Sequence, residues 1–241
     1  PSREAGRSAR PVSPASTRLQ NKPPPVSNLR RFFISPNAMP IDPSVPPDTP
    51  LSKLPNFDPR TVPVVGVDTH LPRVRPEVLE PQALRGRFAS PPRWEPEIWR
   101  EVKFTDREPA LASVLVPIVL RERPSILLTE RTTHLSTHSG QVAFPGGKRD
   151  DTDTDEAHTA LREAHEEIGL TRDKAEVIGT MPTYTTGTRF IITPVIALVQ
   201  PDYRLELNSF EVADAFEVPL DFILDPAHHR RHRIEWAGTS R

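Results

Sequence analysis

The sequence predicts a mixed α/β or α+β fold, in which strands and one amphipathic helix form a layered sandwich. Three observations support this prediction. Of the 30 prolines in the 241-residue chain, 22 precede Leu111, so regular structure is expected mainly after that point. Apolar, β-branched segments of strand length follow from about Trp99. One long segment with helical periodicity, from Asp155 to Ile168, lies between these strands.

Residues 1–60 are rich in Pro, Ser and Arg, as in the stretch RSARPVSPASTRLQNKPPPVSNLRR. They carry too little apolar surface to offset the entropy lost on ordering, so we expect a disordered leader. The first 31 residues are also basic and nearly free of acidic residues, which resembles an organellar transit peptide. The alternatives are a disordered leader without a targeting role and an over-long gene start.

Residues 61–97 are expected to be a linker with one short helix in PEVLEPQALRGRF, and residues 98–241 are expected to be the folded domain. Within that domain LDFIL is expected to be a short helix, and the basic stretch HHRRHR at 228–233 an exposed turn. The expected strands or extended segments are ASVLVPIVLR, SILLTER, QVAF, AEVIGTMPTY, RFIITPVIALVQ and VADAFEVPL.

The overall composition excludes several classes of site. The formal net charge of −1 gives no general attraction to nucleic acid or to an anionic membrane. Because the chain has no cysteine, disulfides, thiolate nucleophiles and Cys-ligated zinc are excluded. No apolar run approaches the ~20 residues of a membrane helix, since the longest ones contain proline. We therefore expect a cytoplasmic protein that has neither nucleic acid nor a membrane as a partner.

The helix from Asp155 to Ile168 separates an apolar stripe from an acidic one. At 100° per residue, Glu163, Glu166 and Glu167 fall together beside the stripe of alanine, leucine and isoleucine. Carboxylates this close repel one another, and the last two lie near the negative end of the helix dipole. One interpretation is a solvated acidic face. The other is a site for Mg²⁺ or Mn²⁺, because hard cations bind carboxylate oxygens.

Glycines lie at both ends of this helical segment. Gly169 suits a left-handed cap at the C-terminal end of the helix. Gly146 and Gly147, which precede the acidic loop, can adopt positive φ and allow the backbone to approach a ligand closely. A Gly-rich turn, an acidic loop and an acidic helix together predict a pocket for a metal ion and phosphate.

The stretch GGKRDDTDTDEAHTALREAHEEIGL resembles the Nudix box, G-x5-E-x7-R-E-U-x-E-E-x-G-U, in which U is an apolar residue. The first half departs from this pattern. One residue too many separates Gly147 from Arg162, and Asp153 stands where the first Glu is expected. The second half fits fully, at Arg162, Glu163, Ala164, Glu166, Glu167, Gly169 and Leu170.

The preceding stretch, LLTERTTHLSTHSGQVAFPGG, resembles the additional signature of the coenzyme A diphosphatase branch of this family. In that branch L-L-T-x-R precedes a Gly-containing loop and F-P-G-G, and the box reads G-G-x-x-D-x-x-D. Thr132 replaces a small Ser or Ala, and Ser136 stands where Arg is usual. The matching positions are Leu127, Leu128, Thr129, Arg131, Gly140, Phe144, Pro145, Gly146, Gly147, Asp150 and Asp153.

This resemblance covers about Ala112 to Trp236 and implies the Nudix α/β/α sandwich with a mixed sheet. The family usually has a further strand and helix near the C-terminus, which the domain at 98–241 is expected to lack. Dimers are common in the family, so a homodimer is left open.

The resemblance also implies a hydrolase that depends on Mg²⁺ or Mn²⁺. Glu163 and Glu167 are its implied metal ligands. Glu166 is implied to be a third ligand or to join through water, and the Gly147 carbonyl to add an oxygen. The general base is implied to be Glu163 or Glu211, with a surface glutamate at a strand edge as the alternative for Glu211.

Further residues are implied to surround the phosphates of the substrate. Arg131 is a candidate phosphate contact, with a structural salt bridge as the alternative. Arg162 is expected to hold one carboxylate in place. Gly146 and Gly147 complete the set that is expected to line the site.

On this resemblance, the chain hydrolyses the diphosphate bond of coenzyme A or a CoA ester, giving 3′,5′-ADP and 4′-phosphopantetheine or its acyl derivative. One alternative is another Nudix activity, on ADP-ribose, a dinucleotide or an NTP. A second alternative is a catalytically idle Nudix-like binding module.

Overall fold

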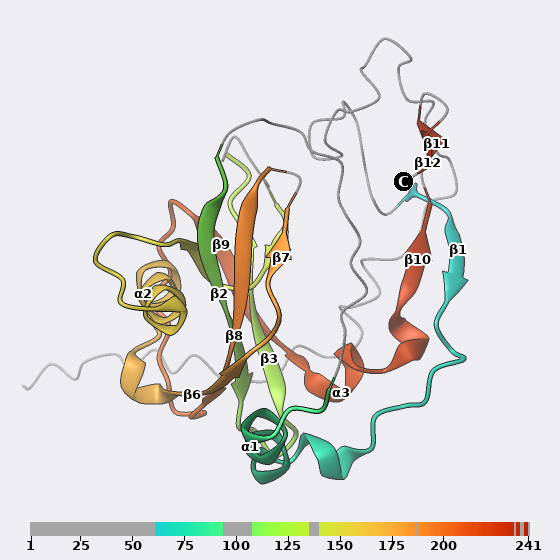
Figure 1. Cartoon of the computed structure of the whole chain (residues 1–241), viewed down its shortest axis with the longest axis horizontal. Helices are drawn as coiled ribbons and strands as arrows, with labels where there is room; N and C mark the ends of the chain where they lie inside the picture. The colour runs from blue at the N-terminus through green and yellow to red at the C-terminus, as the bar shows by residue number, and fades with distance from the viewer. Residues whose placement is uncertain are drawn as a thin grey trace, which may run out of the picture.

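The computed structural model of the chain (Figure 1) describes residues 61–93, 108–134, 140–186, 188–233, 235–236 and 239–240. The expected leader at 1–60 lies outside the described residues, and so do residues 94–107. The described part is dominated by one eight-stranded sheet whose main path runs β4-β3-β2-β8-β6.

The sheet is mixed, as predicted, because β2 and β8 are parallel whereas its other described pairs are antiparallel. Beyond the main path, β5 pairs with β2, β7 with β8, and β9 with β3. The strands are β2 (Ala110–Val119), β3 (Ser125–Arg131), β4 (Val142–Ala143), β5 (Gly146–Lys148), β6 (Ala175–Thr180), β7 (Tyr184–Thr185), β8 (Phe190–Val199) and β9 (Val212–Pro219).

Helices and two small ribbons complete the described structure. The helices are α1 (Pro81–Ala89), α2 (Glu156–Ile168) and α3 (Leu220–Ile223), with 3₁₀ turns η4 (Pro76–Leu79), η5 (Arg172–Lys174) and η6 (Pro226–His228). The ribbons pair β1 (Val64–Val67) with β10 (Arg230–His232), and β11 (Glu235–Trp236) with β12 (Thr239–Ser240). The strands and helices expected between residues 110 and 223 are confirmed.

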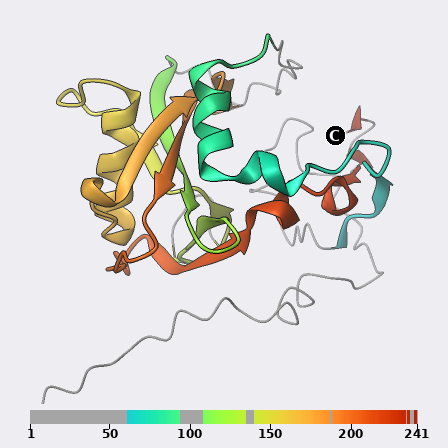
Figure 2. The same ribbon diagram turned by 90° about the horizontal axis from the view of Figure 1, so that it is seen from below.

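Both faces of the sheet are buried, and this explains why its central strands are continuously apolar. On β8, Val195, Ala197 and Val199 pack beneath α2, while Ile196 and Leu198 pack on the opposite face. This alternation follows from the two-residue period of a strand. Figure 2 shows α2 and α1 separated by the sheet, which gives the predicted three-layer α/β/α arrangement.

Proline does not interrupt the central strands. Pro117 lies within β2 and is fully buried, although proline cannot donate a hydrogen bond to a neighbouring strand. On the edge of β2 away from β8, β5 pairs with Ala112–Val114, and β3 pairs only from Ile118 onward. Pro117 therefore lies where that edge has no ladder partner, and β2 continues beside β8 over its whole length.

The segment at 61–93 does more than link, which corrects the expectation for 61–97. The short helix is present as α1, but it packs on the sheet together with η4. Leu79, Leu84 and Phe88 join the apolar cluster that contains Ile118 and Ile196. The sequence pattern could not show this, because the apolar partners of these side chains come from strands far along the chain.

The basic stretch at 228–233 is also corrected. Arg230–His232 forms β10, which pairs antiparallel with β1, so that His232 lies opposite Val64 and Arg230 opposite Val67. Its side chains are exposed, as expected of a basic segment. The β-branched residues of β1 supply a strand partner some 165 residues earlier in the chain, which local sequence could not reveal.

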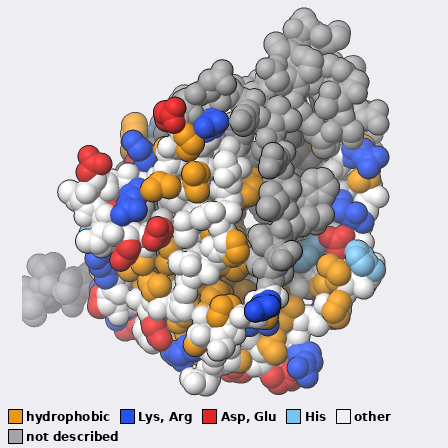
Figure 3. Space-filling model, in the orientation of Figure 1, with side chains coloured by type: hydrophobic (Ala, Val, Ile, Leu, Met, Phe, Trp, Pro, Cys, Tyr) orange, Lys and Arg blue, Asp and Glu red, His pale blue; other side chains and the backbone are white. Residues whose placement is uncertain are grey.

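The visible surface carries mixed charge. On the face seen in Figure 3, acidic, basic and apolar side chains are interspersed over the described part. This agrees with the formal net charge of −1. Among the described helices, none has both the length and the apolar character needed to cross a membrane.

Candidate active site

Helix α2 orients the acidic residues of the site. The Asp155 side chain caps its first turn by accepting a hydrogen bond of 2.7 Å from the backbone N–H of His158. Gly169, with φ of 71°, ends the helix in the left-handed conformation that was predicted. Ala164 and Ile168 are fully buried against the sheet. Glu163 and Glu167, about 100° round the helix from this stripe, therefore face strand β5.

Strand β5 approaches α2 closely because it contains two glycines. The backbone N–H of Gly146 donates to Glu167 Oε2 at 3.1 Å. A Cβ at Gly147 would lie 2.5 Å from the Glu163 carboxyl group, and one at Gly146 would lie 2.4 Å from the Ser113 carbonyl oxygen. The expectation of positive φ holds for Gly146 (158°) and not for Gly147. Close approach is thus the main reason for glycine at both positions.

Glu167 is a buried carboxylate with few compensating partners. Its side chain is 6% exposed. Burial raises its pKa to about 7, and the negative charges of Glu163 and Glu211 add to this effect. The Gly146 N–H and the positive charge of Arg131 oppose the rise without cancelling it. The site therefore concentrates more negative charge than the protein itself neutralises.

Glu163 is a second carboxylate whose pKa is raised, although it is less buried than Glu167. Its side chain is 17% exposed. Burial raises its pKa, Arg162 lowers it, and the charges of Glu166 and Glu211 raise it again. The negative charge of Glu211 raises the pKa of both Glu163 and Glu167, which places Glu211 in the same electrostatic neighbourhood. Its role as the base stays a prediction.

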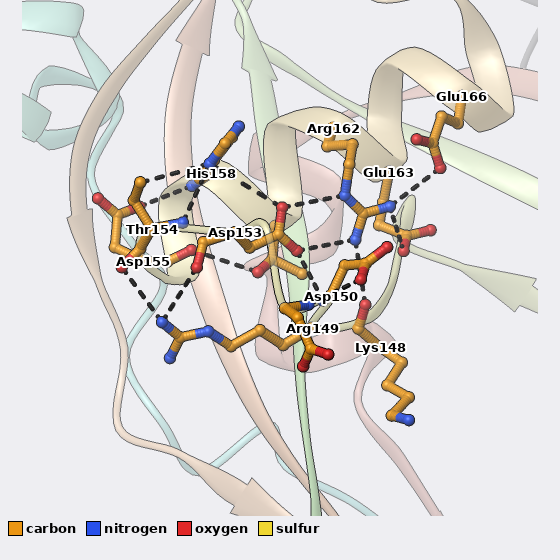
Figure 4. Close-up of polar contacts among 12 residues, drawn as sticks. Lys148, Arg149, Asp150, Asp153, Thr154, Asp155, His158, Arg162, Glu163 and Glu166 are labelled. Atoms are coloured by element: carbon orange, nitrogen blue, oxygen red, sulfur yellow. Dashed lines mark hydrogen bonds and ion pairs between the residues drawn. The ribbon is translucent and has the colours of Figure 1, made fainter.

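Arg162 connects the helix to the acidic loop before it (Figure 4). Its guanidinium donates to both carboxylate oxygens of Asp153, at 3.0 and 2.9 Å, and to the Lys148 carbonyl oxygen at 3.1 Å. Its Nη1 lies 2.9 Å from Glu163 Oε1 and 3.0 Å from Glu166 Oε2. Arg162 therefore orders three carboxylates, where the sequence led us to expect one.

Asp153, in the loop before α2, fixes the position of Arg162. It is buried, and hydrogen bonds from Arg162 hold its pKa well below the usual range. It also accepts a hydrogen bond from the Asp150 N–H at 2.9 Å, which closes the acidic loop. The residue that stands where the Nudix box expects Glu thus fixes the orientation of Arg162 and, through it, of Glu163.

Glu166 and Arg131 lie at the borders of the site. The Glu166 side chain is 54% exposed and is held at the rim by Arg162. Arg131 Nη1 lies 3.7 Å from Glu167 Oε1, an ion pair at long range. The Nε of Arg131 is buried and has no hydrogen-bond partner among the described residues. This guanidinium therefore retains hydrogen-bonding capacity beside the buried carboxylate.

The predicted convergence of three glutamates is corrected to two. Among the described residues, no three acidic or histidine side chains close round a common point. Glu166 is drawn outward by Arg162, which leaves Glu163 and Glu167 as the inward pair. One buried and one partly buried carboxylate, both with raised pKa values, and a third charge nearby still match Mg²⁺ or Mn²⁺. Such ions bind hard oxygen donors and retain several waters.

Two residues that the sequence analysis did not select hold the site together. The Asn208 N–H donates to the Glu167 carbonyl oxygen at 2.9 Å, and the Thr132 N–H donates to the Glu211 carbonyl oxygen at 3.0 Å. These hydrogen bonds connect the segment 208–211, before β9, to α2 and to the end of β3. They are made by backbone groups, so no side-chain pattern in the sequence could have indicated them.

Comparisons with known proteins identify the family of the chain. The NUDIX domain model matches residues 109–236. The uncharacterized Nudix hydrolase NudL of Enterobacter sp. (strain 638) is 47% identical over 127 residues, which cover 53% of this chain and 66% of the relative. The same-named protein of Escherichia coli (strain K12) is 47% identical over 109 residues, covering 45% and 57% respectively. This chain thus spans less than two thirds of the length of these relatives.

Among solved structures, the chain matches a C. elegans Ap4A hydrolase binary complex. It is 19% identical, with a TM-score of 0.40, and the match covers 48% of this chain and 85% of that one.

Proposed function

This chain belongs to the Nudix family, and from that premise we propose that it is a metal-dependent diphosphatase that cleaves coenzyme A or a CoA ester. The observation that carries the proposal is the pair of inward carboxylates. Glu163 and Glu167 are held side by side against the backbone of Gly146 and Gly147. A helix selected for stability alone would not bury two like charges in this way.

The proposed metal ligands are Glu163 and Glu167, with Glu166 joining through water from the rim. The carbonyl of Gly147 is the proposed backbone ligand. A bound Mg²⁺ or Mn²⁺ would neutralise the diphosphate and lower the pKa of a water molecule. This role requires hard oxygen donors with uncompensated charge, and the raised pKa values of both inward glutamates fit that requirement.

The remaining chemistry belongs to side chains of the chain itself. Glu163 or Glu211 accepts a proton from the attacking water, since both carboxylates lie in the same electrostatic neighbourhood as Glu167. Arg131 contacts the substrate phosphate through its partly exposed guanidinium, which lies beside Glu167. Arg162 keeps Glu163 oriented. The products from CoA are 3′,5′-ADP and 4′-phosphopantetheine.

The choice of CoA rests on the resemblance upstream of the box, from Leu127 to Gly147. The second candidate is hydrolysis of another nucleoside diphosphate derivative, such as ADP-ribose, a dinucleotide or an NTP. It is favoured by Ser136, which stands where the CoA branch usually has Arg. A homodimer is proposed from the family alone.

The experiment is a substrate panel. The protein is incubated with CoA, ADP-ribose or NADH and with Mg²⁺ or Mn²⁺, and the products are identified by mass spectrometry. We expect 3′,5′-ADP and 4′-phosphopantetheine to form from CoA faster than any product forms from the other two. Preferred turnover of ADP-ribose or NADH would replace the CoA assignment with the second candidate.

A matched variant separates an enzyme from a binding module. Glu167→Gln keeps the shape of the side chain and removes its charge. We expect turnover to fall by at least about 100-fold, which corresponds to ~3 kcal/mol of lost barrier reduction. Circular dichroism should show an unchanged fold. If the wild type turns over none of the substrates, the binding-module interpretation takes precedence.

A further inference from the structure

Phe210 is an exposed aromatic residue on a firmly held turn. Its side chain is 67% exposed, which is far from its usual environment in a protein core. A single exposed apolar side chain is ordinary by itself. The backbone of Phe210, however, is fixed on both sides. Its N–H donates to Asn208 Oδ1 at 3.2 Å, and its carbonyl accepts a hydrogen bond of 2.9 Å from Thr132 Oγ1.

The turn that carries Phe210 is attached to the catalytic elements. Asn208 bonds to the backbone of Glu167 on α2, and Thr132 directly follows Arg131 at the end of β3. The next residue after Phe210 is Glu211, the candidate base. Phe210 is therefore joined by hydrogen-bonded links to α2 and to the end of β3, and it directly precedes Glu211 in the chain.

One other ring accompanies Phe210. The centroid of the His134 ring lies 5.3 Å from that of Phe210, with the two planes tilted by 56°. His134 Nε2 is within 3.4 Å of Thr132 Oγ1, the hydroxyl that also binds the Phe210 carbonyl. The two rings thus form a small aromatic surface that is supported by a shared threonine and exposed to solvent.

A fixed, exposed aromatic surface beside a diphosphate site is suited to bind the base of a nucleotide. Nucleobases stack on aromatic side chains, and a ring that is already positioned loses little freedom on binding. We infer that Phe210, supported by His134, stacks on the nucleobase of the substrate while its diphosphate lies at Glu163 and Glu167. This inference rests on the proposed function and assigns one residue of the chain to recognition of the base.

The test compares binding of ligands with and without a base. ADP and 3′,5′-ADP carry adenine, whereas 4′-phosphopantetheine does not. Affinities are measured by equilibrium titration for the wild type and for Phe210→Ala, Phe210→Leu and Phe210→Tyr. We expect Phe210→Ala and Phe210→Leu to weaken both adenine nucleotides by about 5-fold or more. Phe210→Tyr should retain wild-type affinity, and 4′-phosphopantetheine should bind all four proteins equally.

The control variant is Val65→Ala. It removes another exposed apolar side chain, on β1, which lies on the opposite side of the molecule from α2 (Figures 1 and 2). It should leave all three affinities unchanged. Unfolding midpoints of the variants establish that each one is folded, and Phe210 is exposed enough that its removal should not disturb the core.

Kinetics provide an independent readout. With CoA as substrate, Phe210→Ala should raise KM by about 5-fold or more and leave kcat within about 2-fold. Unchanged affinity in Phe210→Ala, full affinity in Phe210→Leu, or a wild type that binds neither adenine nucleotide would each overturn the inference. If the wild type binds adenine nucleotides through Phe210 but hydrolyses no diphosphate, the proposed function fails while the stacking inference stands.

Discussion

At the scale of single residues, Glu167 and Glu217 show how partners decide the behaviour of a buried carboxylate. Burial raises the pKa of both groups. At Glu217, hydrogen bonds from Arg121, Ser125 and Tyr203 outweigh burial, and the net pKa is lowered. Glu167 has one N–H donor and a distant guanidinium, so its pKa rises to about 7. Glu217 is part of a structural ion pair, whereas Glu167 has few partners within the protein.

The raised pKa of Glu167 predicts a pH dependence of stability in the presence of a chelator. Below pH 4.5, Glu167 is protonated in both the folded and unfolded states. As pH rises from 4.5 through 7, the unfolded state ionises first, so the folded state loses stability. The loss relative to Glu167→Gln should reach up to about 3 kcal/mol at pH 8.

Urea denaturation of the wild type and Glu167→Gln at pH 5 and pH 8 measures this difference. Excess Mg²⁺ at pH 8 should restore part of the wild-type stability and should have little effect on the variant. Parallel stability profiles for the two proteins would show that Glu167 ionises as an exposed glutamate does.

At the scale of elements, the approach of β5 to α2 sets the geometry of the site. Gly147→Ala places a methyl group where the Glu163 carboxyl group lies. The end of a glutamate side chain can move, so we expect the free energy of unfolding to change by less than about 1 kcal/mol. The displaced carboxylate should reduce turnover by at least about 10-fold, as measured by product release from CoA.

Gly86→Ala is the matched control. Gly86 lies within α1, and a Cβ there would meet no atom within 4 Å. Alanine is favoured over glycine in a helix, so this variant should be more stable by about 0.5–1 kcal/mol and fully active. An active Gly147→Ala would show that the Glu163 position is not critical.

The local elements were predictable because the sequence carries their signals within a few residues. Strands β2, β3, β8 and β9 show as apolar runs, and α2 shows as a period of 3.6 bounded by Asp155 and Gly169. The inward direction of Glu163 and Glu167 also follows from that period. The outward direction of Glu166 follows as well, because it lies roughly opposite Ala164 and Ile168 on the helix. Its contact with Arg162 does not follow, because Arg162 is fixed by Asp153 across nine positions of sequence.

Contacts between segments far apart in the chain could not be predicted from the local sequence pattern. The β1–β10 ribbon and the packing of α1 against β6 join segments separated by most of the domain. The same holds for Asn208 at Glu167, a backbone contact that any residue other than proline could make. Sequence periodicity thus predicts which face of an element is apolar, and tertiary structure decides what covers it.

At the scale of the whole molecule, the sheet has two apolar faces and needs two covers. Helix α2 covers one face, while η4, α1 and α3 contribute to the cluster on the other. The residues of the proposed diphosphate site lie on the α2 side. Substitutions in η4, α1 or α3 should therefore change the stability of the protein and have little effect on its turnover of substrate.

Leu79→Ala tests this separation. Leu79 is 6% exposed and packs in the cluster with Ile118 and Ile196. Its truncation should lower the free energy of unfolding by about 2–4 kcal/mol while kcat stays near the wild-type value at a temperature where the variant is folded. The neighbouring Val78→Ala, at an exposed position, should change stability by less than about 0.5 kcal/mol. Equal effects of the two substitutions would mean that η4 does not cover the sheet.

The packing of residues 61–93 on the sheet has a practical consequence for the design of shorter versions of this protein. The stretch recognised as the family domain starts at residue 109, downstream of α1 and η4. A fragment cut at that boundary would retain all the acidic residues of the site, yet it would lose Leu79, Leu84 and Phe88 from the cluster that covers Ile118 and Ile196 on the far side of the sheet. We expect such a fragment to aggregate through this exposed apolar surface during purification. A lack of activity in the fragment would then say nothing about the activity of the intact protein.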